Sequence, residues 1–370
     1  MGNGVGYGGE AEFVFSRNEL TGAIGDSVTV LPIVVAVGVL TNLSLSMMLV
    51  WFGVCQVVWG LYYGVPVSVE PMKALAALLI AGTITAEELL VAGVLLGGAL
   101  LVIGATGSLE RLGEYVGPPV VRGVQFGVAL VLVETGVGLG AANLELAGLA
   151  LGVAAALIAA GHWNLSAFGV LLVGGAIAAV SAGPPSPGLP ATGGTLLFGL
   201  SDLTTSAVAA SVAQLAMTLG NAALATSVLL WDYFDRRVSP DELSTSMGAM
   251  NLVAIPLGAM PMCHGSGGVA GKHAFGARTA GTNVILGVGY VAVAVLAVGV
   301  VAAYPPSMLG VILGLIALQL GRTSLGEIDS GVLGYLLVVA IGVCGLVVNL
   351  GVAFVGGVLA HLLARRSGRL

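Results

Sequence analysis

The sequence contains few charged residues: Asp, Glu, Lys and Arg make up 8% of its 370 residues, whereas hydrophobic residues make up 57%. Such a chain cannot fold as a water-soluble globule, because too few polar side chains remain to cover its exterior. The mean hydropathy of +1.06 agrees with this exclusion. Apolar runs at 89–107, 284–303 and 332–349 each have the roughly 20 residues that cross a hydrocarbon layer of about 30 Å as a helix. The composition therefore predicts an all-α polytopic membrane protein.

Other scarce features exclude further classes of protein. The three cysteines, Cys55, Cys263 and Cys344, fall within apolar segments, which argues against a disulfide framework. Cys and His form no second cluster at metal-ligand spacing, so no metal or other cofactor is predicted. No basic face or nucleic-acid motif is present, and nucleic acid is not expected as a partner. The first 16 residues carry Glu10 and Glu12 in place of a basic segment with a cleavage site, so a signal peptide is not predicted.

Apolar segments and their breaks predict fourteen membrane spans, seven on each side of a Pro/Gly-rich link. The first seven lie near 19–40, 44–63, 66–82, 87–107, 117–138, 144–161 and 165–182. The second seven lie near 203–231, 243–258, 260–277, 281–303, 306–321, 331–347 and 349–364. The predicted organisation is thus a mobile N-terminal tail (1–18), a first repeat (19–182), an extracellular link (183–202), a second repeat (203–364) and a basic cytoplasmic tail (365–370).

The arginines test this topology independently, because short cytoplasmic loops collect Lys and Arg. With the N-terminus inside, all arginines fall at cytoplasmic ends of spans: Arg17, Arg111, Arg122, Arg236, Arg237, Arg278, Arg322, Arg365, Arg366 and Arg369. The outer loops carry Glu87, Glu88 and Glu145 instead. The pattern predicts a multi-pass protein of the cell membrane with both termini in the cytoplasm.

An odd number of spans in each half places the halves upside down relative to each other, which is the inverted-repeat plan of many secondary transporters. An offset of 195 residues aligns Asp26 with Asn221, Gln56 with Asn251, and the prolines at 66 and 261. The scarce polar residues and prolines coincide at this offset, although overall identity does not exceed chance. We therefore expect seven-plus-seven inverted repeats.

The third and tenth predicted spans are interrupted by residues that an ordinary membrane helix excludes. The third reads GVPVSVEPMKALAALLIAG at 64–82, and the tenth reads PMCHGSGGVAGKHAFGARTAG at 261–281. Pro71 suits the first position of a helix, where its missing N–H is not needed. We expect each break to be a short extended segment followed by a half-helix, whose first-turn N–H groups point into the membrane centre.

Irregular backbone survives at that depth only where it is buried in protein or lines a watery cavity. In inverted halves the two half-helix N-termini would face each other, with Lys73 and Lys272 one or two turns along. Gly265, Gly267 and Gly268 would let a bound group approach the backbone closely. Two opposed positive helix ends near two lysines predict an anion site.

Simpler interpretations remain for several of these residues. The glycine run could pack closely within one ordinary membrane helix. Glu70 and Lys73 are three residues apart on one helical face, so they could neutralise each other, or Glu70 could carry a proton. Gln56 and Asn251 fit hydrogen bonding between helices better than ligand binding.

Other polar residues within the spans also leave alternatives open. His264, beside Cys263, fits a neutral donor to substrate or a titrating group better than a metal ligand. Asp26 and Asn221 correspond between the halves, so both are expected to line the cavity. Glu134 has no obvious partner and is either buried in its protonated form or nearer to an interface.

These residues are similar to the signatures of a known family, the molybdate transporters related to the SulP sulfate permeases. The first-half resemblance is carried by ELTGAIGD at 19–26, GVPVSVEPMKA at 64–74 and PVVRGVQ at 119–125. The second-half resemblance is carried by MNL at 250–252, GAMPMCHGSGGVA at 258–270 and FGAR at 275–278. Two positions depart from the family pattern: Glu70 stands where the family usually has Gln, and KHA at 272–274 stands where Gln-Tyr-Arg is expected.

The resemblance implies a transporter, not an enzyme, that binds molybdate first and sulfate second between the third and tenth spans. By analogy it implies proton symport, with a core of spans one to four and eight to eleven moving against a gate formed by the others. Protons, the lipid bilayer and a second copy of the chain are the other expected partners. The implied substrate-binding residues are Met72, Lys73, His264, Gly265, Ser266, Gly267 and Gly268, with Gln56 and Asn221, and the proton would be carried by Asp26 or Glu70.

Three rival functions remain open on the sequence. A transporter of the same fold could carry a nucleobase, to which Glu70 could hydrogen-bond, or bicarbonate. A passive anion channel would ignore a pH gradient. An intramembrane enzyme ranks last, because His264 with Cys263 or Ser266 is the only conceivable catalytic group.

Overall fold

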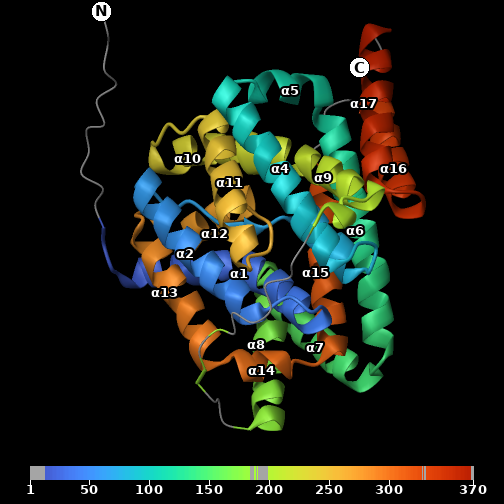
Figure 1. Cartoon of the computed structure of the whole chain (residues 1–370). Helices are drawn as coiled ribbons and strands as arrows, with labels where there is room; N and C mark the ends of the chain where they lie inside the picture. The colour runs from blue at the N-terminus through green and yellow to red at the C-terminus, as the bar shows by residue number, and fades with distance from the viewer. Residues whose placement is uncertain are drawn as a thin grey trace, which may run out of the picture.

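The computed structural model describes residues 13–183, 187–188, 190, 199–326, 328 and 331–367. Most of the predicted tail and link, and the end of the basic tail, lie outside these residues. The helices are α1 (Arg17–Leu40), α2 (Leu45–Tyr63), α3 (Lys73–Ile80), α4 (Ala86–Thr106), α5 (Leu109–Val116), α6 (Pro118–Ala141), α7 (Leu144–Ala159), α8 (Ser166–Ala182), α9 (Thr205–Met217), α10 (Thr226–Phe234), α11 (Pro240–Ala254), α12 (Ser266–Ala274), α13 (Gly281–Leu296), α14 (Val298–Ala302), α15 (Pro306–Gly326), α16 (Gly331–Val347) and α17 (Leu350–Arg366). Figure 1 shows their arrangement.

Short elements connect several of these helices. Three are 3₁₀ turns, η1 (Trp163–Leu165), η2 (Leu200–Asp202) and η4 (Ile255–Leu257), and one is a π-helix, η3 (Thr218–Ala225), which joins α9 to α10. Two strands of two residues each, β1 (Glu70–Pro71) and β2 (Met262–Cys263), precede α3 and α12.

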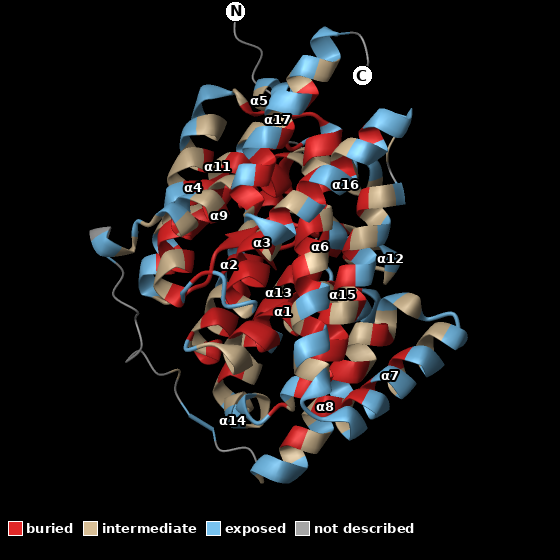
Figure 2. Ribbon diagram, turned by 90° about the vertical axis from the view of Figure 1, so that its right-hand side faces the viewer, coloured by how far each residue is buried: buried red, intermediate tan, exposed pale blue. Residues whose placement is uncertain are grey.

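The prediction of a helical membrane protein is confirmed. Seven helical stretches among the described residues are long and apolar enough to cross a membrane: Arg17–Leu40, Leu45–Tyr63, Ala86–Thr106, Pro118–Ala141, Trp163–Ala182, Thr205–Phe234 and Pro306–Gly326. Shorter apolar helices are Leu144–Ala159, Gly281–Leu296 and Gly331–Val347. In Figure 2 buried residues gather on the central helices, among them α1, α3 and α13, whereas α7, α8 and α17 carry long exposed faces. The core of the molecule is therefore at the centre of the helices that surround β1 and β2.

The helices pack as two groups. In one, α1 and α2 contact α12 and α13, and α4 contacts α9 and α11; in the other, α6 contacts α15, α16 and α17, and α7 contacts α8. Reciprocal glycines make close approaches between helices, which is typical of membrane helices. A Cβ on Gly53 of α2 would lie 2.6 Å from the carbonyl oxygen of Gly287 of α13. A Cβ on Gly136 of α6 would likewise lie 2.6 Å from the carbonyl oxygen of Gly310 of α15. Larger residues at these four positions would force the helices apart.

The strands pair antiparallel, Glu70 opposite Cys263 and Pro71 opposite Met262, and so bring the two predicted breaks together. Backbone outside a helix needs other hydrogen-bond partners when it is buried. Asn251 supplies them for β2, since its side chain accepts the N–H of Met262 at 2.8 Å and donates to the carbonyl of Met262 at 2.6 Å. The predicted role of Asn251 in bonding between segments is thus seen, with the backbone of β2 as its partner.

Three features of the helices differ from the prediction. The segment between the fourth and fifth predicted spans is not a plain loop, because it forms the helix α5. Its buried residues, Leu109 and Val116, lie two turns apart on one face. The predicted span at 203–231 contains the π-helix η3, and the predicted span at 281–303 is divided into α13 and α14.

Candidate functional site

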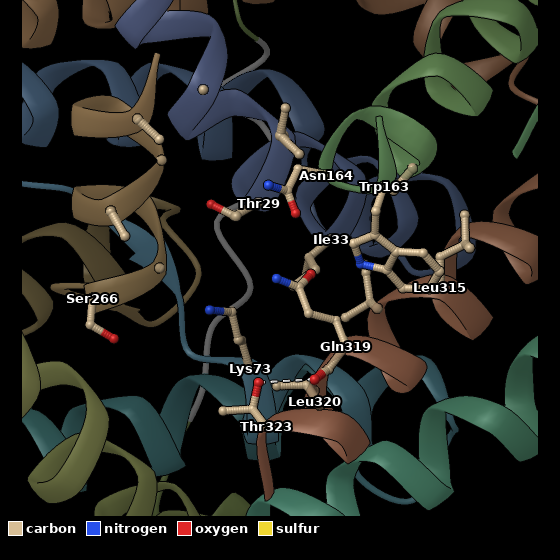
Figure 3. Close-up of a pocket in the computed structure, with 18 of the residues that line it drawn as sticks. Thr29, Ile33, Lys73, Trp163, Asn164, Ser266, Leu315, Gln319, Leu320 and Thr323 are labelled. Carbon is tan, nitrogen blue, oxygen red and sulfur yellow. Dashed lines mark hydrogen bonds between the residues drawn. The ribbon is translucent and has the colours of Figure 1, made fainter. Parts of the chain in front are cut away.

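A cavity of about 350 Å³ lies between the two groups of helices (Figure 3). One wall is formed by α1, Lys73 at the start of α3, Asn221 of η3 and the first residues of α12. The opposite wall is formed by α15 and by the turn that leads from η1 into α8, with Trp163 and Asn164. Figure 3 shows the amine of Lys73 pointing into the space between Ser266 and Gln319. A ligand here would therefore touch both groups of helices.

Four predicted site residues line this cavity: Lys73, Asn221, Ser266 and Gly267. The hydroxyl of Ser266 donates to Asn221 Oδ1 at 2.6 Å, which links α12 to the π-helix. The N–H groups of Ser266 and Gly267 belong to the first turn of α12, where they have no acceptor within the helix. Gly265, the N-cap residue, has no side chain that could cap them. This wall thus presents an ammonium group, a hydroxyl, a side-chain amide and a helix N-terminus.

The other predicted site residues lie behind the cavity wall. They are Met72, His264, Gly265, Gly268, Gln56, Asp26 and Glu70, and all of them are buried. The N–H of Met72 is taken by the carbonyl of Pro261 at 3.0 Å, and the N–H of Gly268 is taken by Glu70. In this structure these two N–H groups are therefore engaged by the protein itself.

His264 occupies a closed environment. One ring nitrogen, Nε2, lies 2.8 Å from the hydroxyl of Ser246, and the other, Nδ1, lies 3.0 Å from the carbonyl of Ser68. The rings of Trp59 and Tyr63 pack edge-on against the imidazole. His264 therefore joins α11 to the extended segment before β1, and does not reach the cavity.

Glu70 holds the junction between the two breaks. Its Oε2 lies 2.5 Å from Lys73 Nζ, and its Oε1 accepts the N–H of Gly268 at 2.5 Å. The hydroxyl of Thr29 is 3.5 Å from the same Oε1 atom. The pairing of Glu70 with Lys73, one of the two readings of their spacing, is thus formed.

Lys272 points away from the cavity, contrary to the expectation that it adds charge to an anion site. Its side chain is fully buried, and its Nζ lies 3.3 Å from Asp26 Oδ2. The ammonium donates to Gln56 Oε1 at 2.9 Å, to the carbonyl of Val67 at 2.6 Å and to Asn283 Oδ1 at 3.2 Å. Lys272 therefore ties α12 to α1, α2, α13 and the extended segment before β1.

Asp26 is likewise absent from the cavity lining, whereas its counterpart Asn221 is part of it. The hydroxyl of Ser68 donates to Asp26 Oδ1 at 2.5 Å, and Gln56 Nε2 donates to Oδ2 at 2.7 Å. Together with Lys272, these donors enclose the carboxylate. Each lysine of the chain is thus matched by one buried carboxylate.

The opposite wall supplies polar residues that the sequence reasoning missed. Gln319 and Thr323 of α15 line the cavity with Asn164, and Trp163 stacks under Arg322, whose Cζ lies 4.2 Å from the ring centroid. Gln319 and Thr323 are four residues apart and share one face of α15, following an apolar run from 308 to 318. That spacing was the signal that could have revealed them.

Two open points of the sequence reasoning concern residues away from the cavity. Glu134 is exposed on α6, so the buried alternative does not apply to it. Within the described ranges, no group of three or more His, Cys, Asp or Glu side chains could hold a metal ion.

Comparisons with known proteins agree on one family. A family model described as "Molybdate transporter of MFS superfamily" matches two stretches of equal length, 18–132 and 206–320. Molybdate transporter 2 of Arabidopsis thaliana is 28% identical over 405 residues, which cover 94% of this chain and 87% of that protein. Molybdate transporter 1 of the same plant is 28% identical over 350 residues, covering 80% of this chain and 77% of the relative. Molybdate transporter 1 of Chlamydomonas reinhardtii is 25% identical over 429 residues, with 82% and 83% covered.

Solved structures share the fold at low sequence identity. The transmembrane domain of the cyanobacterial bicarbonate transporter BicA superimposes with a TM-score of 0.68 at 17% identity, covering 92% of this chain and 97% of that domain. SLC26A9 also gives a TM-score of 0.68, at 14% identity, covering 94% of this chain and 64% of that one. The arrangement of helices is therefore that of these anion transporter structures.

Proposed function

This chain belongs to the molybdate transporter family, and we propose that it is a secondary active transporter that imports a tetrahedral oxyanion, molybdate first and sulfate second. The observation that carries the proposal is the cavity wall on which Lys73, Ser266 and the N-terminus of α12 converge. An ammonium group, a hydroxyl and first-turn N–H groups are donors that suit the oxygen atoms of an anion.

The anion contacts Lys73, Ser266, Gly267 and Asn221 in this proposal, because these residues line the cavity. Met72, His264, Gly265, Gly268 and Gln56 support the wall from behind. The coupling proton is carried by Asp26 or Glu70, the two carboxylates that pair with the lysines next to the site.

The proposed topology has fourteen spans in seven-plus-seven inverted repeats, with broken third and tenth spans and both termini in the cytoplasm. Three observations support it. Each predicted span overlaps a described helix or a strand-and-helix unit. The family model matches one stretch of equal length in each half. The two breaks meet at the β1–β2 pair, and short helices, α3 and α12, leave from it.

Transport proceeds in this proposal by movement of the first group of helices, as the core, against the second group, as the gate. The cavity between them supports this, since a ligand there contacts both groups. Its lining includes the C-terminal half of α15 and the last residues of α12, close in sequence to Arg322 and Arg278. By the positive-inside rule these arginines mark the cytoplasmic side, which supports the assignment of this conformation to an inward-open state.

Calorimetric titration of the purified protein with sodium molybdate tests the site. Lys73→Ala and Ser266→Ala should each weaken binding, because the first removes the ammonium group from the cavity wall and the second removes the hydroxyl that holds Asn221 in that wall. Ser181→Ala is the matched control, since Ser181 is exposed near the end of α8 and donates to the carbonyl of Ile177. Unchanged molybdate affinity in both cavity variants would show that the anion binds elsewhere.

Uptake into proteoliposomes tests the substrate and the coupling. Tungstate and sulfate should compete with molybdate, whereas competition by uracil or bicarbonate instead would indicate another substrate on the same fold. An inward proton gradient should accelerate uptake. Uptake that ignores the gradient, together with steady conductance in planar bilayers, would indicate a passive anion channel.

A further inference from the structure

Glu70 lies directly behind the wall of the cavity, and its own side chain is only 1% exposed. Two of the groups that hold its carboxylate, the ammonium of Lys73 and the hydroxyl of Thr29, belong to residues that line the cavity. The third is the N–H of Gly268, in the first turn of α12. A buried carboxylate thus engages the ammonium group that a bound anion would use, together with an N–H of the first turn of α12.

The backbone around this carboxylate leaves no room for larger residues. A Cβ on Gly265 would overlap the carboxyl group of Glu70, and a Cβ on Gly268 would lie 2.7 Å from Oε1. Gly267, which faces the cavity, is less constrained, since its Cβ would come no nearer than 3.7 Å to the same oxygen. The glycine-rich start of α12 therefore fits closely around Glu70 and leaves space only on the cavity side.

The charges around the cavity already balance before an anion enters. Lys73 is paired with Glu70, and Lys272 is paired with Asp26. An incoming anion therefore meets Lys73 with its charge already neutralised by Glu70, which is covalently part of the protein. Anion binding must therefore overcome the attraction between Glu70 and Lys73.

We propose that the Glu70 carboxylate is an internal anion that occupies Lys73 and the start of α12 in the absence of substrate, and that the transported oxyanion competes with it for these groups. The inference rests on the proposed function. Coulomb attraction to Lys73 grows with the charge of the ligand, so a dianion displaces a carboxylate more readily than a monoanion does. Displacing Glu70 costs the same for every ligand, so a weakly attracted monoanion such as nitrate no longer binds measurably, whereas a dianion such as molybdate still does.

Calorimetry on the full chain, with Glu70→Gln as the variant, measures this competition. Glutamine keeps the size of the side chain and removes its charge, so molybdate should bind at least about tenfold more tightly, which corresponds to about 1.4 kcal/mol. Nitrate should compete with molybdate in Glu70→Gln and not in the wild type. The matched control is Glu134→Gln, which removes the same charge from an exposed position on α6 and should bind as the wild type does.

Three outcomes separate this inference from the proposed function. If the wild type binds molybdate and Glu70→Gln binds it no more tightly, the inference is wrong and the function stands. If neither protein binds molybdate, the proposed function is wrong and the inference falls with it. If Glu70→Gln binds molybdate and the wild type does not, Glu70 occupies the site but molybdate does not displace it, so both the proposed substrate and the competition are wrong.

A measurement on the wild type covers the case in which the variant does not fold. Protein carrying ¹³C-carboxyl glutamate is compared by infrared difference spectroscopy with and without sodium molybdate. Displacement of Glu70 from Lys73 should shift a labelled carboxylate band, and nitrate should not produce the shift. Molybdate binding without any change in the labelled bands would overturn the inference.

Discussion

Replacement of Lys272 with methionine would show how much the buried ion pair contributes to holding α12 in place. The ammonium lies 3.3 Å from Asp26 Oδ2 and donates to Gln56, Val67 and Asn283 in a fully buried environment. Methionine keeps the unbranched shape of the side chain and removes both the charge and the donors. The variant therefore leaves the carboxylate of Asp26 without its cation.

The expected loss of stability depends on which of the groups that contact Lys272 keep another hydrogen-bond partner in the variant. Gln56 Oε1 and the carbonyl of Val67 still accept hydrogen bonds from Asn283 Nδ2, at 2.9 and 2.7 Å. The cost is therefore dominated by Asp26, and removal of one partner of a buried ion pair costs about 3–5 kcal/mol. With an unfolding entropy of about 2.1 cal/mol/K per residue, a chain of 370 residues would lose about 4–6 °C in Tm.

Thermal unfolding of the detergent-purified protein, followed by tryptophan fluorescence, measures this loss. The double variant Lys272→Met with Asp26→Asn no longer has an unpaired buried carboxylate. It should therefore unfold at a higher temperature than Lys272→Met alone. If Lys272→Met unfolds within about 1 °C of the wild type, the ion pair does not stabilise the protein as argued. The same conclusion follows if the double variant loses the sum of the two single losses.

Three further predictions concern the surroundings of the cavity. Gly268→Ala should abolish the folded peak in size-exclusion chromatography, because its methyl would overlap buried oxygen atoms, whereas Gly267→Ala meets only one oxygen, at 3.7 Å, and should fold. Gln214→Leu should destabilise the protein by about 1–3 kcal/mol in thermal unfolding, because its Oε1 accepts the buried N–H of Ala74 at 2.9 Å. Gln319→Leu should weaken molybdate binding about two- to tenfold in calorimetry and leave Tm unchanged, because Gln319 faces the cavity. An unaltered affinity would remove Gln319 from the site.

The positions of the two short strands could be predicted, because the residues there are incompatible with an ordinary membrane helix. Pro71, Glu70 and the glycines from 265 to 268 mark both junctions in the sequence, and β1 and β2 lie there in the structure. The helix α5 was missed because it is short and lies among charged residues. The π-helix η3 could not be predicted, since nothing in the sequence from 218 to 225 distinguishes an i to i+5 pattern from an ordinary helix.

The site was predicted from one wall only. The two interrupted spans of the sequence contain Lys73, Ser266 and Gly267, which line the cavity. The opposite wall comes from α15, whose predicted span shows no break, and from η1, which lies between two predicted spans. Which distant helices face each other is decided by tertiary packing, here by close contacts such as that between Gly136 and Gly310, and no local pattern reports it.

Lys73 and Lys272 show most clearly that a local sequence pattern does not report tertiary packing. Each lies in a short helix that follows a strand, and the sequence assigns both of them to one anion site. Lys73 is the first residue of α3, and its partly exposed side chain pairs with Glu70 and lines the cavity. Lys272 lies two turns along α12, where the helix packs against α1, and there it meets Asp26. Distance from the start of the helix therefore separates a cation that lines the cavity from one that is buried in the core.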